Sequence, residues 1–210
     1  TFAARYQFDL QEPGVVELYP EHDDFAVRTS GLPGIGLLGV TFGYLVAMDS
    51  PSGRADGEFH WGTTLWHERA HVFTLEATDH LVPRWFSEGV SVFEEWSTGP
   101  LPGRHIPLHV LDAMKEEKFL PVAELDSGFI RPTYEGQIMV SYMQAGLICQ
   151  YIAERWGQQG LVAMLNGFRD GATTANAIEP ALGVVPETFD RGFTEFVERE
   201  FGGTLGALEA

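Results

Sequence analysis

The chain has 210 residues, and 44% of them are hydrophobic, including 15 Phe, 5 Trp and 6 Tyr, which suffices for a core without covalent staples. The 13 basic and 30 acidic residues give a formal net charge of −17, a surface that repels nucleic acid and anionic membranes. The single cysteine, Cys149, excludes an intrachain disulfide and a cysteine-based zinc site.

The N-terminal part of the chain has the pattern of a small sheet. The uncharged stretch 31–48 approaches the minimum length of a membrane helix, but Pro33 and five glycines favour a loop and two short buried strands instead. We therefore expect no membrane insertion by this segment. The expected elements are a strand at 15–20, a short helix at 21–30, strands at roughly 37–41 and 43–48, and a hydrophilic loop at 49–58.

From about residue 60 onward, the apolar residues recur at helical spacing. Gly157 should end a long helix, and Pro186 suits the first turn of another. The expected helices cover about 60–75, 83–96, 107–118, 135–156, 158–169, 173–182 and 186–201, with a loop at 97–104 and an irregular segment at 119–134.

This layout predicts an α+β fold in which a small N-terminal mixed sheet packs on a mainly helical body. We expect one catalytic domain over 1–210, with a sheet-rich part at 1–58 and a helical part at 59–210. The chain begins at Thr1 without a signal-like segment, so it resembles a mature product or a piece excised from a longer protein. The compartment stays open, with export slightly favoured over the cytoplasm, and nothing indicates the oligomeric state.

Residues 67–71 read His-Glu-Arg-Ala-His within the first of these helices. Two histidines four residues apart on a helix point the same way, so both imidazoles can reach one metal ion. Glu68 lies beside them, where its carboxylate can take a proton from a water that zinc has acidified. A motif with three fixed positions arises by chance in roughly one chain in a few hundred of this length, so a third ligand must decide.

The position of the third ligand separates classes of zinc site. A metzincin would have a histidine six residues after the second histidine, where this chain has Ala77, and a glycine where it has Thr74. A gluzincin has a glutamate on the next helix, and Glu88 stands there, 17 residues after His71, which leaves room for a turn. Its neighbours in 85–93 are largely aromatic and aliphatic, and a carboxylate buried among them needs a cationic partner.

Together, HERAH at 67–71, WFSEG at 85–89 and Glu95 resemble the gluzincin metallopeptidases, and they are most similar to bacterial peptidase MA-like domains. In that family, a helix bearing HExxH is followed by a helix with a tryptophan, the glutamate ligand and a further glutamate. The resemblance is strong over 60–96 and weaker elsewhere, where segment 141–157 is similar to the long C-terminal helix of the family. It implies a zincin-like fold of the thermolysin and aminopeptidase N type, with an HExxH active-site helix.

The resemblance also implies a role for each matching residue. His67, His71 and Glu88 match the zinc ligands, and Glu68 matches the general base that activates the zinc-bound water. Glu95 follows Glu88 by seven residues, on the same helix face, and matches an acid that orients a ligand histidine.

A tyrosine of the family often stabilises the oxyanion; Tyr142 matches its place better than Tyr134, and either could instead pack in the core. Two family features are absent. Val92 stands where thermolysin-like enzymes have an aspartate, and residues 39–44 (GVTFGY) lack the carboxylate that binds a substrate α-amine in aminopeptidases. The second absence favours an endopeptidase, and this strand could pair with an extended substrate.

The sequence therefore predicts zinc-dependent hydrolysis of internal bonds in a peptide or protein substrate, with Glu68 as the base. The alternative is a catalytically silent gluzincin-like domain that binds a peptide or a partner protein without turnover. The first is favoured because all three ligands and the base are present.

Overall fold

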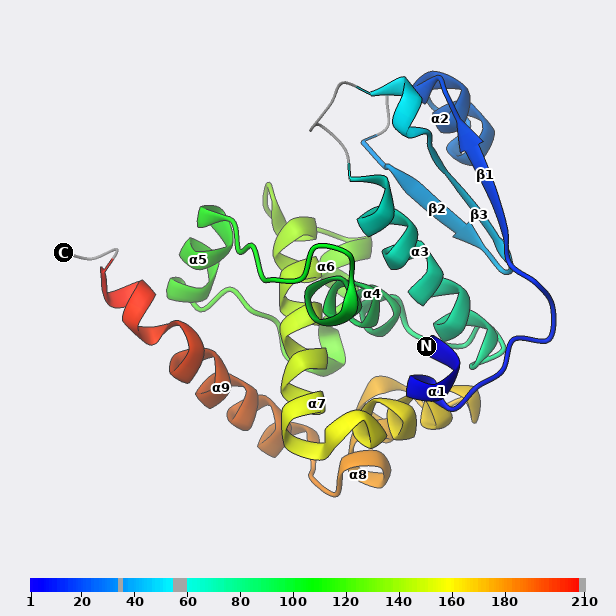
Figure 1. Ribbon diagram of the computed structural model, residues 1–210. Helices are drawn as coiled ribbons and strands as arrows, with labels where there is room; N and C mark the ends of the chain where they lie inside the picture. The colour runs from blue at the N-terminus through cyan, green and yellow to red at the C-terminus, as the bar shows by residue number, and fades with distance from the viewer. Residues whose placement is uncertain (34–35, 55–59, 208–210) are drawn as a thin grey trace.

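The structure is a computed structural model that describes residues 1–33, 36–54 and 60–207. These residues form a small sheet beside a larger group of helices, so the predicted α+β class is confirmed (Figure 1). The predicted boundary between 58 and 59 lies outside the described residues, as does part of the predicted loop at 49–58. In chain order the elements are α1 (Phe2–Tyr6), β1 (Val15–Tyr19), α2 (His22–Ser30), β2 (Gly39–Phe42), β3 (Leu45–Asp49), a 3₁₀ turn (Pro51–Gly53), α3 (Trp61–Glu76), α4 (Arg84–Thr98), α5 (Leu108–Lys115), a second 3₁₀ turn (Val122–Glu124), α6 (Asp126–Ile130), α7 (Gln137–Arg169), α8 (Thr174–Leu182) and α9 (Pro186–Ala207).

The sheet has the strand order β1-β3-β2 and is mixed, as predicted. β1 runs parallel to β3, and β2 runs antiparallel to it. Gly43 and Tyr44 form the turn between β2 and β3, and Gly43 has a φ of 56°, which glycine adopts without steric cost. The two strands begin about two residues later than predicted because this turn lies where the second strand was expected. β2 is therefore an edge strand of the sheet that the structure describes.

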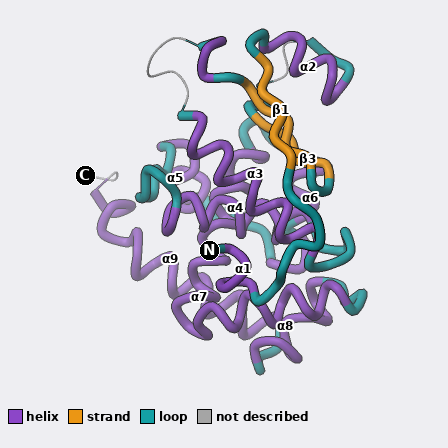
Figure 2. Tube along the Cα trace, turned by 45° about the vertical axis from the view of Figure 1, so that its right-hand side comes forward, coloured by secondary structure: helices purple, strands orange, loops and turns teal. Residues whose placement is uncertain are grey.

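The sheet lies between α3 and α2. Successive residues of β3 point to opposite faces, so alternate side chains of this strand meet the two helices. Val46 and Met48 pack against Val72 of α3 in a small apolar cluster. Asp49 points to the other face, where His22 of α2 contacts its carboxylate at 3.0 Å. Figure 2 shows the three strands as a thin layer at the edge of the helical mass. One face of the sheet thus holds α3 in place.

The main core belongs to the helices, and α4 is its central element, packed between α3 and α7. Trp85, Phe86 and Val90 of α4 are almost completely buried. The predicted break at Gly157 is present as a kink within α7, where this residue has a φ of 70° and a ψ of −177°. None of the helices in the described ranges is both long and apolar enough to span a membrane.

The sequence did not predict α1, which covers the back of α3 and α4. Phe2 lies 5.1 Å from the ring of Trp66 and 5.4 Å from that of Phe73, both in α3. Tyr6 donates a 2.6 Å hydrogen bond to the buried carboxylate of Glu94 in α4. Elsewhere, α6 and a 3₁₀ turn lie in the segment predicted to be irregular, and α9 runs six residues beyond its predicted end. The N-terminal residues are thus part of the core that supports the two central helices.

Candidate metal centre

The helices that carry the motif residues are fixed at their N-terminal ends by side-chain caps. The His60 imidazole accepts a hydrogen bond of 3.1 Å from the Thr63 amide at the start of α3. At the start of α4, Asp126 accepts one of 2.7 Å from the Trp85 amide, which places a negative charge at the positive end of the helix. The Trp85 indole also donates to Thr174 at 2.9 Å. The first turn of α4, which leads to Glu88, is therefore fixed by hydrogen bonds from both the backbone and the side chain of Trp85.

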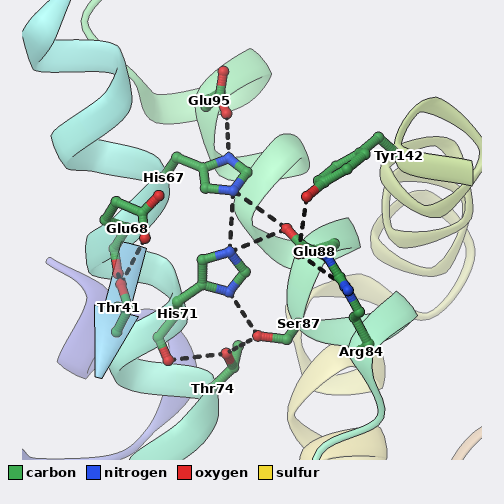
Figure 3. A network of polar contacts seen from close by, with 10 residues as sticks. All are labelled: Thr41, His67, Glu68, His71, Thr74, Arg84, Ser87, Glu88, Glu95 and Tyr142. Atoms are coloured by element: carbon green, nitrogen blue, oxygen red, sulfur yellow. Dashed lines mark hydrogen bonds and ion pairs between the residues drawn. The ribbon is translucent and has the colours of Figure 1, made fainter. Parts of the chain in front are cut away.

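Three side chains converge where α3 faces α4 (Figure 3). His67 Nε2 and His71 Nε2 are 3.0 Å apart, and Glu88 Oε2 lies 3.4 Å from the first and 3.1 Å from the second. Two ligand atoms on a tetrahedral zinc ion are about 3.3 Å apart, given bonds of about 2.0–2.1 Å. The three atoms thus have the mutual spacing of three corners of a zinc tetrahedron, and within the described chain they form a group that could hold a metal ion.

The hydrogen bonds behind His71 determine which of its nitrogens faces this point. The Thr74 hydroxyl donates to the His71 carbonyl at 3.1 Å, so its oxygen is left to accept from the Ser87 hydroxyl, 2.7 Å away. Ser87 in turn accepts from His71 Nδ1 at 2.7 Å. Nδ1 therefore carries a proton, and Nε2 is the nitrogen of His71 that faces Glu88.

His67 is supported by a carboxylate instead. Its Nδ1 contacts Glu95 Oε1 at hydrogen-bonding distance, so Nδ1 donates and Nε2 again faces the convergence point. Burial would lower the pKa of His67, but the hydrogen bonds and charges of Glu88 and Glu95 outweigh burial and raise this pKa to about 10. The negative surroundings of the imidazole therefore attract a cation, whether a proton or a metal ion.

Glu88 is mostly buried, and its two carboxylate oxygens have different surroundings. Oε2 faces the two imidazoles, 3.4 Å from His67 Nε2 and 3.1 Å from His71 Nε2. Oε1 accepts a hydrogen bond of 3.1 Å from the Tyr142 hydroxyl and lies 3.5 Å from Arg84 Nε. Burial would raise the pKa of Glu88, but the two histidines outweigh it and hold the pKa below its usual value. Glu88 is therefore ionised, with one oxygen directed at the convergence point.

Tyr142 keeps its proton in this arrangement. Burial, and then the charge of Glu88, raise the pKa of the Tyr142 hydroxyl well above its usual value. The rival Tyr134 packs under the ammonium group of Lys118, 5.0 Å from the centre of its ring, and does not line the cavity around the cluster in the part of the chain that is described. The structure thus brings Tyr142, not Tyr134, to the predicted site.

Glu68 lies on the sheet side of α3, and its side chain is buried. Its Oε2 accepts a hydrogen bond of 2.7 Å from the Thr41 hydroxyl of β2, which also lies 3.0 Å from the Glu68 carbonyl oxygen. Figure 3 shows this pair beside the two imidazoles, with Thr41 reaching toward α3 from its strand.

A cavity of about 970 Å³ surrounds these groups and lies between the sheet and the helices. One wall is formed by residues 36–41, and the opposite wall by α4, the loop after it and α7. Arg84 is the one Lys or Arg among the described lining residues. Apolar side chains contribute much of the remaining surface: Leu37, Leu38, Leu101, Met139 and Met143. The cluster therefore opens into a cavity with a largely apolar lining.

Apart from the rival Tyr134, the structure brings together the residues that the sequence singled out for the site. Sequence reasoning missed the groups that hold those residues in place, namely Thr41, Thr74, Ser87 and Arg84. Ser87 precedes Glu88 within WFSEG, so its position offered a signal, whereas Thr41 is distant in sequence and offered none.

This helix pair brings two histidines and a glutamate around one point, which is a donor set that could hold a metal ion. A family model described as the peptidase MA superfamily matches residues 50–199, which is more than half of the chain. The chain belongs to the peptidase MA superfamily. No curated protein and no solved structure matches it. Membership suggests a metal-dependent, peptidase-like function and a peptide substrate.

Proposed function

We propose that the chain is a zinc metalloendopeptidase in which His67, His71 and Glu88 hold the ion. The observation that carries this proposal is the convergence of two imidazole nitrogens and one carboxylate oxygen, 3.0–3.4 Å from one another, around a point that could hold a metal ion. Such a group is costly to bury unless a cation neutralises it. The donor set of two histidines and one carboxylate is typical of catalytic zinc, which keeps its fourth position open.

Zinc bound there would supply a Lewis acid that lowers the pKa of water and polarises the scissile carbonyl. Glu68 takes the proton from the attacking water and delivers it to the leaving amine. Tyr142 lies on the opposite side of the cluster with a protonated hydroxyl, which supports its role as a donor to the oxyanion. Glu95 and Ser87 keep the two imidazoles in the orientation that ligation requires.

The substrate would lie in the cavity as an extended chain. β2 borders the cavity and is an edge strand of the described sheet, so it can pair with a peptide backbone. No carboxylate stands in residues 39–44 to bind a terminal amine, which favours internal peptide bonds. The apolar lining of both walls favours apolar side chains near the cleaved bond.

We also propose that residues 1–210 act as one catalytic unit, although the family model matches only 50–199. Contacts of two N-terminal residues support this proposal. Thr41, outside the matched range, donates to Glu68 within it, and Phe2 packs on Trp66 and Phe73. Removing the N-terminal residues would therefore uncover the core and release the base.

The test combines zinc analysis with cleavage of a quenched-fluorescent peptide library. We expect one zinc ion per chain by mass spectrometry, and turnover that a chelator removes and zinc restores. Glu68→Gln should retain the zinc ion and lose at least about 100-fold in kcat, because general-base catalysis contributes roughly 10²–10⁴. Glu195→Gln, an exposed change of the same kind on α9, serves as the control.

The outcomes separate the two functions that the sequence left open. Zinc binding with no cleavage that depends on Glu68 would favour the silent peptide-binding domain. A chain that takes up no zinc after dialysis against the metal would contradict both the centre and the enzyme.

A further inference from the structure

β2 presents two residues to α3, and both lie against Glu68. Residues two apart on a strand point to the same face, so Gly39 and Thr41 share the face that meets the helix. The residue at the end of the strand, Phe42, belongs to the alternate set, and its side chain is 51% exposed. Both residues of the strand that face α3 therefore contact Glu68.

Gly39 provides the space for the Glu68 side chain. A Cβ atom at this position would lie 2.8 Å from Glu68 Cγ, 2.9 Å from Glu68 Oε1 and 3.0 Å from Thr64 Cγ2. These separations are shorter than normal contacts between side-chain atoms. Any larger residue at 39 would push the carboxylate or the strand away.

Thr41 provides the hydrogen bond. Its hydroxyl has one proton and two acceptors within reach, and both belong to Glu68: Oε2 at 2.7 Å and the backbone carbonyl at 3.0 Å. In the part of the chain that the structure describes, this hydroxyl is the one donor hydrogen-bonded to the carboxylate. The helical residues around the metal-binding cluster do not contact the carboxylate through a hydrogen bond.

We propose that Thr41 is a positioning residue for Glu68, and that Gly39 makes room for the pair. The inference rests on the proposed function, in which β2 pairs with substrate and Glu68 is the base. It assigns β2 a second role, which is to position Glu68. Thr41 touches neither the cluster nor the reacting atoms; it acts by limiting the rotamers of Glu68. Accurate placement of a base beside the water it deprotonates is worth large factors in rate.

The test compares Thr41→Val, which keeps the shape and removes the donor, with Thr41→Ser, which keeps the donor. Zinc content, melting temperature, kcat and KM are measured for both on one quenched peptide. Thr41→Val should lower kcat by about tenfold or more, with zinc content unchanged and KM changed by less than about twofold, and Thr41→Ser should recover most of the loss. Thr29→Val is the matched control, because Thr29 also donates its hydroxyl to a backbone carbonyl, on α2.

A second measurement keeps the inference testable without turnover. Crystal structures of Thr41→Val, with and without zinc, should show the Glu68 carboxylate in another rotamer or in several, whereas crystals of the wild type should show one. A wild-type kcat for Thr41→Val beside an inactive Glu68→Gln would overturn the positioning role and leave the proposed function standing. If wild type cleaves no peptide, the proposed function fails, and the position of Glu68 in the crystals decides the inference: an unmoved carboxylate overturns it.

Discussion

The two walls of the cavity hold their functional groups in different ways. On the helical side, each of the three proposed metal ligands has its own supporting partner on α4 or α7: Glu95, Ser87 and Tyr142. On the sheet side, Glu68 is held by Thr41 alone among the described residues. The proposed metal ligands are thus supported at three points within the helices, and the proposed base at one point on an edge strand.

The apolar core beneath the helical wall is also larger than the one beneath the sheet wall. The helical core is extensive and includes the fully buried Phe86 and Leu147, whereas the cluster under the sheet consists of Val46, Met48 and Val72. Regions with few buried apolar contacts open at lower free energy than the main core. From this comparison we predict that metal binding and turnover depend on different parts of the molecule, so substitutions should separate them.

The largest effect should come from Glu88→Gln, which breaks the helical side. Gln keeps the volume of the side chain but removes the negative charge at the convergence point. Since loss of an outer partner alone costs about 10–100-fold in metal affinity, loss of a direct ligand should lower zinc affinity by at least about 100-fold and abolish turnover. Competition with a chromophoric chelator measures the affinity.

Two comparisons sharpen this result. Glu195→Gln removes an equal charge from the exposed face of α9 and should bind zinc like wild type. Thr41→Val, on the sheet wall, should also keep full zinc affinity. Tight zinc binding by Glu88→Gln would show that the metal centre lies elsewhere.

The next effect concerns the back of α4, where Arg5 contacts Glu94 at 2.8 Å. Glu94 is completely buried, and its other donors are the hydroxyls of Tyr6 in α1 and Thr98 in α4. Arg5→Met keeps the aliphatic stem and leaves the carboxylate without a cation. The free energy of unfolding should fall by about 2–3 kcal/mol, below the full cost of breaking a buried pair because Arg5 is about one-third exposed.

Urea denaturation in the presence of a chelator measures this change without a contribution from bound metal. Arg199→Met is the control, since Arg199 forms ion pairs at the surface of α9 that should be worth at most about 1 kcal/mol. Equal losses for the two variants would show that α1 does not support the helical side.

The sequence predicted the cluster because its geometry is local to two helices. The spacing of His67 and His71 places both on one helix face, and the WFSEG segment places Glu88 on the helix that follows. The kink at Gly157 could also be predicted from the sequence, because a glycine readily adopts a positive φ, which interrupts a helix locally. These features depend on backbone rules that act over a few residues.

The supporting contacts could not be predicted in the same way. Thr41 reaches Glu68 only after β2 has folded onto α3, 27 residues further along the chain. The five-residue α1 is too short to form by helix propensity, and it exists because Phe2 and Tyr6 are buried against distant helices. Tertiary packing determines both the Thr41–Glu68 contact and the formation of α1, so no local sequence pattern predicts them.

The smallest effects should come from the partners of the two imidazoles, which compare two kinds of support within the helical side. Glu95→Gln replaces the charged partner of His67 by a neutral one, and zinc affinity should fall by about 10–100-fold. Ser87→Ala removes the neutral partner of His71, worth one ordinary hydrogen bond, and should cost about tenfold or less. Chelator competition at one fixed pH measures both.

Ser97→Ala provides the control for the serine change, because Ser97 lies on α4 and donates only to a backbone carbonyl near the surface. The expected order, with Glu95 above Ser87 and Ser87 above Ser97, follows from charge-assisted hydrogen bonds being roughly twice as strong as neutral ones. A larger loss for Ser87→Ala than for Glu95→Gln would contradict this order. It would mean that the chain from Thr74 through Ser87, which fixes the tautomer of His71, matters more to the metal than the charge beside His67.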